Sequence, residues 1–311
     1  MCVLSIIIPA YNASSDIQKC IDSIADSLSI SDFKTTEIEV IVINDGSTDN
    51  TLEILETLCF KYSFLKVESQ NNCGVSKARN KGLGLSTGKY VQFVDADDSI
   101  SLLYFSEISS LIESEYYLLV YGFNSQSHKK IKEYIYKGQD SELLENYLKG
   151  KARINIWSCL FRRDLIERWQ LRFDESTYYG EDREFLVKAL LLSISTFYIP
   201  RSLYNYNLLN MSSAMNSSYS AKRLTSIEAD LRLLQFAIAH NCSDVIIRLL
   251  KNQVLSNFYI NKRLVDSSDD PQAIEGLGNY LYLQQEFPPF QLTKFWLYSF
   301  CSWLLCKIKW I

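Results

Sequence analysis

The stretch VIVINDGSTD occupies residues 40–49 and has the pattern of a buried strand that ends in a ligand-binding turn. Its first part, residues 40–43, is a β-branched run, and Asn44, Asp45 and Gly46 follow it. Ligands of open α/β sheets bind at the carboxyl ends of the strands, so Asp45 is placed to meet a ligand. Ser47 and Asp49 are better explained as turn and helix-capping residues.

The sequence on both sides of this stretch alternates between short apolar runs and longer segments with helical spacing. The pattern predicts the order βαβαβαβ, which indicates an α/β fold with a doubly wound, mostly parallel sheet. Ser14 or Ser15 and Asp49 are the expected N-caps of the first two helices. The predicted strands are Leu4–Ile8, Val40–Ile43, Leu65–Val67 and Tyr90–Val94, and the predicted helices are Asp16–Leu28, Thr51–Phe60 and Ser76–Leu85.

The rest of the chain mixes strands and helices before it becomes helical throughout. From Tyr219 to Val265 the apolar residues keep helical spacing, which predicts a helical C-terminal appendage. Between the two regions the pattern predicts a strand over Tyr116–Phe123, a loop or exposed hairpin over 124–137, helices over Ser141–Lys149 and Glu181–Leu192, and a strand over Thr196–Tyr206.

Composition excludes several classes of protein. The 311 residues are 47% hydrophobic, which is enough for a large core, and the chain is too long for one average domain. Lys and Arg total 32 against 36 acidic residues, so the net charge of −4 argues against a general nucleic-acid binder. The eight cysteines form no CxxC pair and the two histidines lie far apart, which argues against a zinc finger. The thiols and the lack of a signal-peptide pattern predict a cytoplasmic protein.

A second group of acidic residues, DADD at 95–98, follows the predicted strand Tyr90–Val94. Carboxylates packed this closely repel one another, so they need a cation, a basic partner or raised pKa values. Such a cluster suits Mg²⁺ or Mn²⁺ shared with a substrate diphosphate. The alternative is a helix N-cap at Asp98 or Ser99, which explains one aspartate and not three.

Two further segments carry charged residues at predicted helix starts. The segment GVSKARN at 74–80 places a glycine at a loop-to-helix junction and Lys77 and Arg79 one turn inside, which is consistent with a phosphate-bearing ligand. A solvated helix face explains Lys77 equally well. Glu181 and Asp182 open another helix, where acidic residues are common partners of the helix dipole, and a catalytic role is the alternative.

Taken together, these segments and their order resemble the family 2 glycosyltransferases. The resemblance covers roughly residues 3–210, and the motifs that carry it are SIIIPAYN at 5–12, VINDGSTD at 42–49, GVSKARN at 74–80, DADD at 95–98 and GED at 180–182. It implies a glycosyltransferase A fold that binds a nucleotide-sugar at the C-terminal edge of its first parallel sheet.

The resemblance also implies roles for individual residues. Pro9, Tyr11 and Asp45 would hold the base and ribose of the nucleotide, and Arg79 would lie near the donor. Asp95 and Asp97 match the family's DxD pair, in which the first residue faces the ribose or sugar. The second, Asp97, faces a divalent ion, Mg²⁺ or Mn²⁺, on the diphosphate.

The proposed reaction follows from the same resemblance. Asp182 matches the general base that deprotonates the acceptor hydroxyl, so the displacement inverts the anomeric centre.

The expected domains are a catalytic domain over 1–215, with a nucleotide-sugar half over 1–103 and an acceptor half over 104–215, and a helical region over 216–311. The expected enzyme is a hexosyl- or N-acetylhexosaminyltransferase that uses a nucleotide-diphosphate sugar, with UDP as the expected nucleotide. Its expected acceptor is a lipid-linked glycan of O-antigen, lipopolysaccharide or capsule biosynthesis.

Two departures from the family pattern bear on this prediction. Many relatives carry an arginine and a histidine after a tyrosine pair, but here Tyr204-Asn205-Tyr206 is followed by Asn207, Leu208 and Leu209. A metal or diphosphate contact from that loop is therefore in doubt. The QxxRW pattern of processive synthases is absent as well, since Leu165 stands where the glutamine before Arg168-Trp169 would be. This favours transfer of a single sugar.

Two other functions compete with this prediction. A protein of the same fold could bind a nucleotide-sugar or glycan without turnover, but the presence of Asp95, Asp97 and Asp182 together argues against it. A nucleotidyltransferase would also use strand-end aspartates and a metal. It should show a glycine-rich, basic loop after its first strand, and PAYN at 9–12 lacks one.

The C-terminal segment Phe295–Cys306 is a nearly uninterrupted apolar run with lysines at 294, 307 and 309. It is too short to span a bilayer, which needs about 20 residues. Aromatic residues beside lysines are typical of an interfacial helix, so we expect peripheral contact with the inner face of the cell membrane. The alternative is a buried helix that closes the appendage.

Overall fold

The computed structural model describes residues 2–127, 130–208, 221–266 and 270–283, which form two compact units. The first is an α/β unit made of residues 1–144, 152–175 and 181–217. The second is a mainly helical unit made of 145–151, 176–180 and 218–311. The expected tail helix, Phe295–Cys306, lies outside the described residues.

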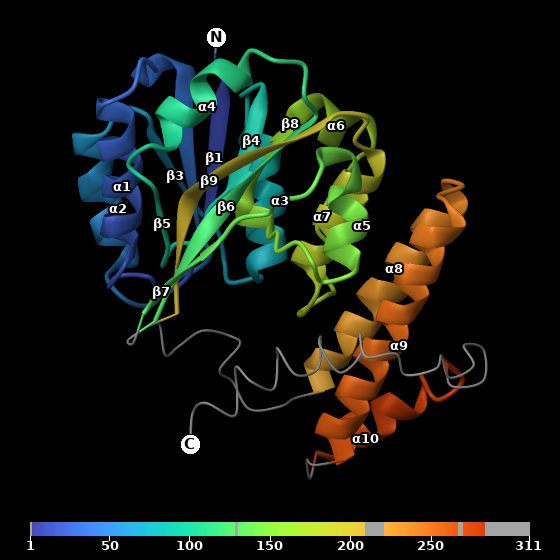
Figure 1. The fold of residues 1–311 in the computed structure, drawn as a ribbon. Coiled ribbons are helices and arrows are strands. Elements are labelled where there is room, and N and C mark those ends of the chain that lie inside the picture. The colour runs from blue at the N-terminus through green and yellow to red at the C-terminus, as the bar shows by residue number, and fades with distance from the viewer. Residues whose placement is uncertain (1, 128–129, 209–220, 267–269, 284–311) are drawn as a thin grey trace. The chain divides into compact units, whose positions relative to one another are not determined.

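Four parallel strands in the order β3-β2-β1-β4 begin the sheet of the α/β unit. Nearly every residue of β1 and β2 is buried, because helices cover both faces of the sheet. Helices α1 and α2 lie on one side and α3 on the other (Figure 1), which confirms the doubly wound prediction. The elements are β1 (Leu4–Ala10), α1 (Ile17–Ser29), β2 (Ile38–Asn44), α2 (Thr51–Lys61), β3 (Leu65–Ser69), α3 (Val75–Leu85) and β4 (Tyr90–Phe93).

Beyond β4 the sheet becomes mixed and continues in the order β8-β6-β9-β5. Strand β8 runs antiparallel to both β4 and β6, whereas β6 and β9 are parallel. Strand β7 pairs with β6, so the segment expected as a loop or hairpin is a hairpin. The elements are β5 (Ser99–Ile100), α4 (Tyr104–Ile112), β6 (Leu118–Gln126), β7 (Ile131–Tyr134), α5 (Leu143–Leu148), β8 (Cys159–Arg162), α6 (Arg163–Arg168), α7 (Glu181–Leu192) and β9 (Thr196–Asn207).

Strand β8 was not predicted, because its four residues are too few to show a period. A 3₁₀ turn, Ile156–Ser158, precedes it and α6 follows it at once. Its side chains are buried, and Phe161 packs against Phe93 of β4 and Phe185 of α7. Packing between distant parts of the chain therefore places this strand.

Side-chain capping of the first helices differs from the prediction. Neither Ser14 nor Ser15 caps α1, and the backbone N–H of Ser14 instead donates to Asp49 Oδ2 at 3.1 Å. Asp49 does serve the start of α2, because its Oδ1 accepts from the backbone N–H of Thr51 at 3.0 Å. Asp49 thus joins the starts of both helices, which explains it without a catalytic role.

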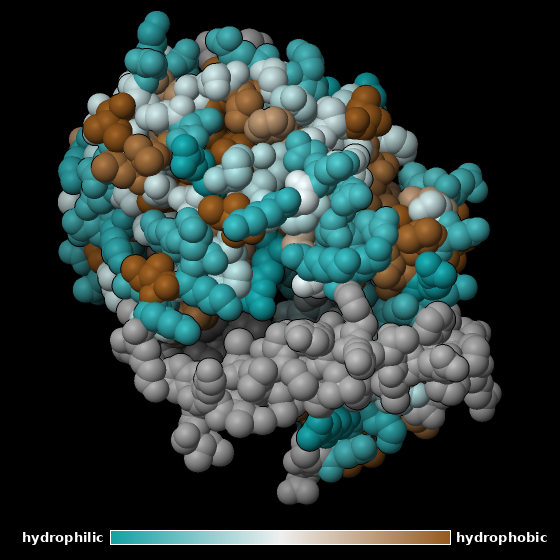
Figure 2. Space-filling model, viewed as in Figure 1, coloured by the Kyte–Doolittle hydropathy of each residue, from teal (hydrophilic) through white to brown (hydrophobic). Residues whose placement is uncertain are grey.

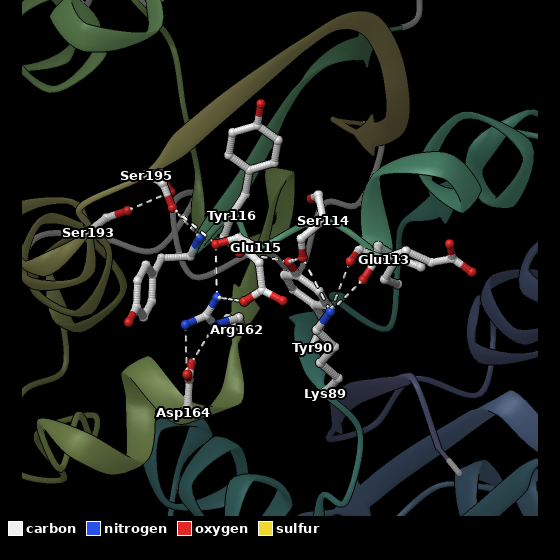
Figure 3. Close-up of polar contacts among 12 residues, drawn as sticks. Lys89, Tyr90, Glu113, Ser114, Glu115, Tyr116, Arg162, Asp164, Ser193 and Ser195 are labelled. Atoms are coloured by element: carbon white, nitrogen blue, oxygen red, sulfur yellow. Dashed lines mark hydrogen bonds and ion pairs between the residues drawn. The ribbon is translucent and has the colours of Figure 1, made fainter.

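Charged and polar side chains tie the strands together at the amino-terminal edge of β4. Lys89 Nζ donates to the carbonyls of Ile112 and Ser114 at the end of α4, where a cation also complements the helix dipole (Figure 3). Arg162 pairs with both carboxylate oxygens of Asp164, at 2.7 and 2.8 Å, and its Nη1 donates to the carbonyl of Glu115. These contacts hold β8 between β4 and β6 at the edge opposite the strand ends that carry the motifs.

The helical unit contains α8 (Thr225–Ala239), α9 (Asp244–Asp266) and α10 (Pro271–Gly278). The predicted helical region is therefore confirmed over its described residues, with a break between α8 and α9 where Asn241 has φ of +51°. A partly buried polar contact joins α8 to α9, since Asn257 donates to Asp230 at 2.9 Å. Among the described residues, no helix is long and apolar enough to cross a membrane.

The visible surface of the α/β unit is largely hydrophilic, and its hydrophobic residues form small, separate patches (Figure 2). Isolated apolar residues of this kind are ordinary on a protein surface. The coloured part of this face therefore offers no broad apolar docking surface.

Candidate active site

The motif residues converge on one edge of the sheet, toward the bottom of the view in Figure 1, where parallel strands end together. Pro9 lies near the end of β1 and pairs in register with Ile43 of β2. Asp45 follows β2, and Asp95 comes two residues after β4 ends. Alignment of the strand ends thus brings segments that are far apart in the sequence to one place.

The turns after β1 and β2 are hydrogen-bonded to each other. Asn12 has φ of +50°, and its Oδ1 accepts from the backbone N–H of Thr48 at 2.8 Å. Its own backbone N–H donates to Ser47 Oγ at 3.0 Å. Tyr11, which lies between these anchored positions and β1, is 51% exposed. Tyr11 is therefore presented at the surface of the edge on an ordered turn.

Asp45 is buried and organises the segment that leads into α3. Its Oδ1 accepts from Gln70 Nε2 at 2.8 Å and from the backbone N–H of Cys73 at 2.9 Å. Its Oδ2 accepts from the backbone N–H of Gly74 at 2.8 Å. Gly46 is required beside it, because its φ is +70° and a Cβ would lie 2.7 Å from the backbone nitrogen of Asn72. Asp45 thus shapes the loop over 70–74 next to the edge.

The three aspartates of the DADD segment have different surroundings. Asp95 Oδ1 lies 3.2 Å from Arg79 Nη2. Asp98 is buried, and its two oxygens accept from the Tyr204 hydroxyl and the backbone N–H of Asn207, each at 2.7 Å. Asp97 is half-buried. The N-cap interpretation of Asp98 or Ser99 is wrong, because β5 follows the segment and α4 begins only at Tyr104.

Burial and like charge perturb these carboxyl groups. Burial, followed by the charge of Asp95, raises the pKa of Asp98 to about 8. Burial also raises the pKa of Asp95, while Arg79 opposes the rise and Asp97 adds to it. The carboxylates of the DADD segment therefore repel one another, as expected from the sequence, and the positive charge of Arg79 offsets part of this repulsion at Asp95.

The end of β9 holds the backbone of the DADD segment. The Tyr204 hydroxyl accepts from the backbone N–H of Asp95 at 3.1 Å while it donates to Asp98. Asn207 Nδ2 donates to the backbone carbonyl of Asp97 at 3.2 Å. Asn207 thus fixes the turn that carries Asp97.

Replacing Tyr204 by phenylalanine is expected to lower the free energy of unfolding by about 1–3 kcal/mol. The ring would keep its stacking on Trp157, at 4.4 Å between centroids, but the buried Asp98 would lose a donor. Urea denaturation measures the loss. Tyr136→Phe, which removes an exposed hydrogen bond to the carbonyl of Gln139, is the matched control and should change stability by less than about 0.5 kcal/mol. Equal losses in the two variants would contradict this prediction.

Arg79 is buried beneath the edge, whereas Lys77, predicted beside it, is exposed. Nη2 of Arg79 pairs with Asp95, and Nη1 of Arg79 lies 3.3 Å from Glu181 Oε1. Its guanidinium carbon lies 5.3 Å from the centroid of the Phe173 ring. Burial favours the neutral form of Arg79, but the charges of Asp95, Glu181 and Asp182 outweigh it and raise its pKa.

Asp182 lies in the first turn of α7, next to Glu181, and is half-buried. Its Oδ1 accepts from the backbone N–H of Arg183 at 2.6 Å. Burial and the charge of Asp182 raise the pKa of Glu181 to about 7, although Arg79 opposes the rise. The start of α7 and the end of β4 therefore share one electrostatic environment around Arg79.

Comparison with known proteins identifies the family. The model described as glycosyl transferase family 2 matches residues 5–169, which is more than half of the chain. The chain belongs to glycosyl transferase family 2. This confirms the resemblance inferred from the motifs.

The chain is also similar to individual glycosyltransferases, in sequence or in structure. The uncharacterized glycosyltransferase EpsJ of Bacillus subtilis strain 168 is 32% identical over 214 residues, which is 66% of this chain and 60% of EpsJ. The crystal structure of S. aureus TarS 1–349 with UDP-GlcNAc has a TM-score of 0.72 at 24% identity and covers 90% of this chain and 81% of that one. The mannosyltransferase PcManGT from Pyrobaculum calidifontis with GDP-Man and Mn²⁺ has a TM-score of 0.57 at 16% identity, over 97% of this chain and 80% of that one.

These likenesses confirm the expected glycosyltransferase A fold with additional C-terminal helices. The match to EpsJ spans less than two thirds of the length of that protein.

The residues of this family 2 chain fit a divalent metal that a substrate helps to bind. Within the described ranges, no three Asp, Glu, His or Cys side chains gather as a metal-binding group. Mg²⁺ is commonly held by one or two carboxylates together with substrate phosphates, so a preformed cage is not needed. Asp97 is half-buried on a turn that Tyr204 and Asn207 hold, and its oxygen ligands suit Mg²⁺ or Mn²⁺.

Sequence reasoning did not find the buried contacts that Glu181, Asp98 and Tyr204 make. Glu181 resembled an ordinary acidic residue of a helix start, and nothing local distinguishes it from Asp182. The pairing of Tyr204 with Asp98 joins residues 106 positions apart, so no short-range signal could reveal it. The unusual closeness of three aspartates was the one indication that some of them needed buried partners.

Proposed function

We propose that this protein is an inverting glycosyltransferase that moves one sugar from a nucleotide-diphosphate donor, with UDP the favoured nucleotide, to a hydroxyl of a glycan acceptor. The observation that carries the proposal is the bridge through Arg79, which places the DADD segment and the start of α7 around one buried cation. A donor site and a base must lie close together for direct displacement, and this arrangement supports that requirement.

In the proposed site, Pro9, Tyr11 and Asp45 bind the base and ribose, and Arg79 and Asp95 lie at the donor. Asp45 acts at least partly through the loop over 70–74, because its carboxylate accepts hydrogen bonds from that loop. Asp97 would hold Mg²⁺ or Mn²⁺. The metal, when bound, neutralises the negative charge that develops on the departing diphosphate.

Asp182 is the proposed general base. Its carboxylate takes the proton of the acceptor hydroxyl as that oxygen forms a bond to the anomeric carbon. The bond from the anomeric carbon to the diphosphate oxygen breaks on the opposite face, and the electron pair leaves with the nucleoside diphosphate. This displacement inverts the anomeric centre.

The relatives guide the choice of substrates. TarS, described as a poly(ribitol-phosphate) β-N-acetylglucosaminyltransferase, is 26% identical over 296 residues, and its solved structure contains UDP-GlcNAc. PcManGT was solved with GDP-Man and Mn²⁺. We extend to this chain a hexosyl or N-acetylhexosaminyl donor and a lipid-linked acceptor in O-antigen, lipopolysaccharide or capsule biosynthesis. Residues 1–215 would form the catalytic domain, with donor contacts from 1–103, acceptor contacts from 104–215 and a helical region over 216–311.

The test is a screen of UDP-Glc, UDP-Gal, UDP-GlcNAc, UDP-GalNAc and GDP-Man, each with Mn²⁺, Mg²⁺ or EDTA. We expect one donor to raise the melting temperature in the presence of metal and to undergo slow metal-dependent hydrolysis to the nucleoside diphosphate. Anomeric configuration of the transferred sugar, read by NMR, tests inversion. Absence of protection and of hydrolysis with every donor would contradict the proposal.

The C-terminal segment supports a cytoplasmic location at the inner face of the cell membrane. Removal of residues 292–311 is expected to abolish sedimentation with anionic vesicles, because Trp296, Trp303 and the flanking lysines would be lost. Neutral phosphatidylcholine vesicles are the control. A soluble truncated protein that still binds anionic vesicles as well as the full chain would contradict membrane contact, and aggregation would assign the segment to the protein core.

A further inference from the structure

Arg79 makes two ion pairs to carboxylates from separate parts of the chain. Asp95 comes from the turn after β4, and Glu181 is the first residue of α7, 102 positions beyond Arg79. Arg79 and Glu181 are both buried, with 6% and 9% of their surfaces exposed. The planar guanidinium therefore spans from the proposed donor carboxylate to the helix that carries the proposed base.

The two terminal nitrogens of Arg79 carry its hydrogen bonds to other side chains. Its Nε makes no hydrogen bond to any described residue, and Phe173 contributes a ring near the guanidinium carbon. The direction of Nη2 toward Asp95 thus depends on what Nη1 binds. Because the guanidinium fork is rigid and planar, fixing one nitrogen fixes the other.

We propose that Glu181 is a positioning residue for the donor site, which holds Nη1 of Arg79 so that Nη2 orients the Asp95 carboxylate. This inference rests on the proposed function, in which Asp95 lies at the donor and Asp182 is the base. Glu181 itself touches neither substrate nor metal in this role. Its effect on the donor passes through Arg79.

Nucleotide affinity tests the inference. The variants are Glu181→Gln, Asp95→Asn and the double variant, with UDP and GDP in the presence of Mn²⁺ as probes in isothermal titration calorimetry. We expect Glu181→Gln to weaken binding by about tenfold, and the double variant to be weakened by much less than the product of the single effects, because both act through Arg79. Unchanged affinity in Glu181→Gln, or effects that multiply, would overturn the inference.

The matched control is Glu184→Gln on the same helix. Glu184 is also buried and also ion-paired, with Lys188 at 2.6 Å, but the pair lies within α7. We expect this variant to bind the nucleotides as the unaltered protein does. An equal loss of affinity in Glu184→Gln would mean that any disturbance of α7 weakens binding, and would overturn the specific role of Glu181.

Thermal unfolding without nucleotide separates this inference from the proposed function. If Arg79 couples the two carboxylates, the shift in melting temperature of the double variant should differ from the sum of the single shifts by about 2 °C or more. Additive shifts would overturn the inference. Failure of the unaltered protein to bind either nucleotide would contradict the proposed function, and the thermal cycle would still decide whether Glu181 positions Arg79.

Discussion

Replacing Asp182 by asparagine is expected to lower the rate of sugar transfer by roughly 10²- to 10⁴-fold while donor affinity stays nearly unchanged. Asparagine keeps the size of the side chain and can still accept from the backbone N–H of Arg183, but it cannot take the acceptor proton. The loss should therefore appear in kcat and not in the affinity for the nucleotide. Transfer assays at saturating donor, with donor binding measured by calorimetry, check both parts.

Glu184→Gln serves as the control here as well, because it removes a carboxylate of the same helix whose ion pair is with Lys188. We expect it to retain transfer. An Asp182→Asn protein that loses donor binding in proportion to activity would make Asp182 a structural residue. One with normal transfer would exclude it as the base.

Replacing Asp97 by asparagine is expected to abolish metal-dependent transfer while the fold stays intact. The substitution removes a proposed metal ligand from a turn that Tyr204 and Asn207 continue to hold through backbone atoms and Asp98. It also removes one negative charge beside Asp95 and Asp98, which relieves repulsion. The melting temperature without metal should consequently be equal to or slightly above that of the unaltered protein.

Transfer assays across a Mn²⁺ titration, together with the Mn²⁺-dependent change in melting temperature, measure the effect of Asp97→Asn. Asp49→Asn is the control, since Asp49 belongs to the turn after β2 and its described partners are Ser14 and Thr51. Full activity of Asp97→Asn at ordinary metal concentrations would contradict the metal role. Unfolding of the variant would instead assign Asp97 to the structure of the turn.

The first half of the sheet was predictable because its signals are local. Strands β1, β2 and β4 are short, mainly apolar segments, β3 has apolar residues at its first and third positions, and each connecting helix has helical spacing. The predicted and observed bounds therefore differ by at most two residues. Parallel strands end at one edge, so the order of strands and helices was enough to place Asp45 and Asp95 together. The helix Glu181–Leu192 has the predicted bounds.

In the second half of the sheet, parts of the structure could not be predicted because tertiary packing, and not the local sequence pattern, places them. Strand β8 is only four residues long and takes its place between β4 and β6 through its buried side chains. For Asp98 the local pattern left a helix N-cap open as an alternative, because acidic residues favour the start of a helix, but a strand follows instead. The contacts of Asp98 with Tyr204 and Asn207 required β9 to return beside β5, which no neighbouring residue signals.

The sequence by itself determined the α/β fold, the family and the edge that carries the site, because strand and helix periodicity and the motif order are properties of short segments. Tertiary structure alone decided how the charges are arranged. Arg79 meets Glu181, and Asp98 meets Tyr204, only after segments about a hundred positions apart have packed together. A buried charge needs its partner wherever the chain supplies one, so the partner of each carboxylate followed from the fold.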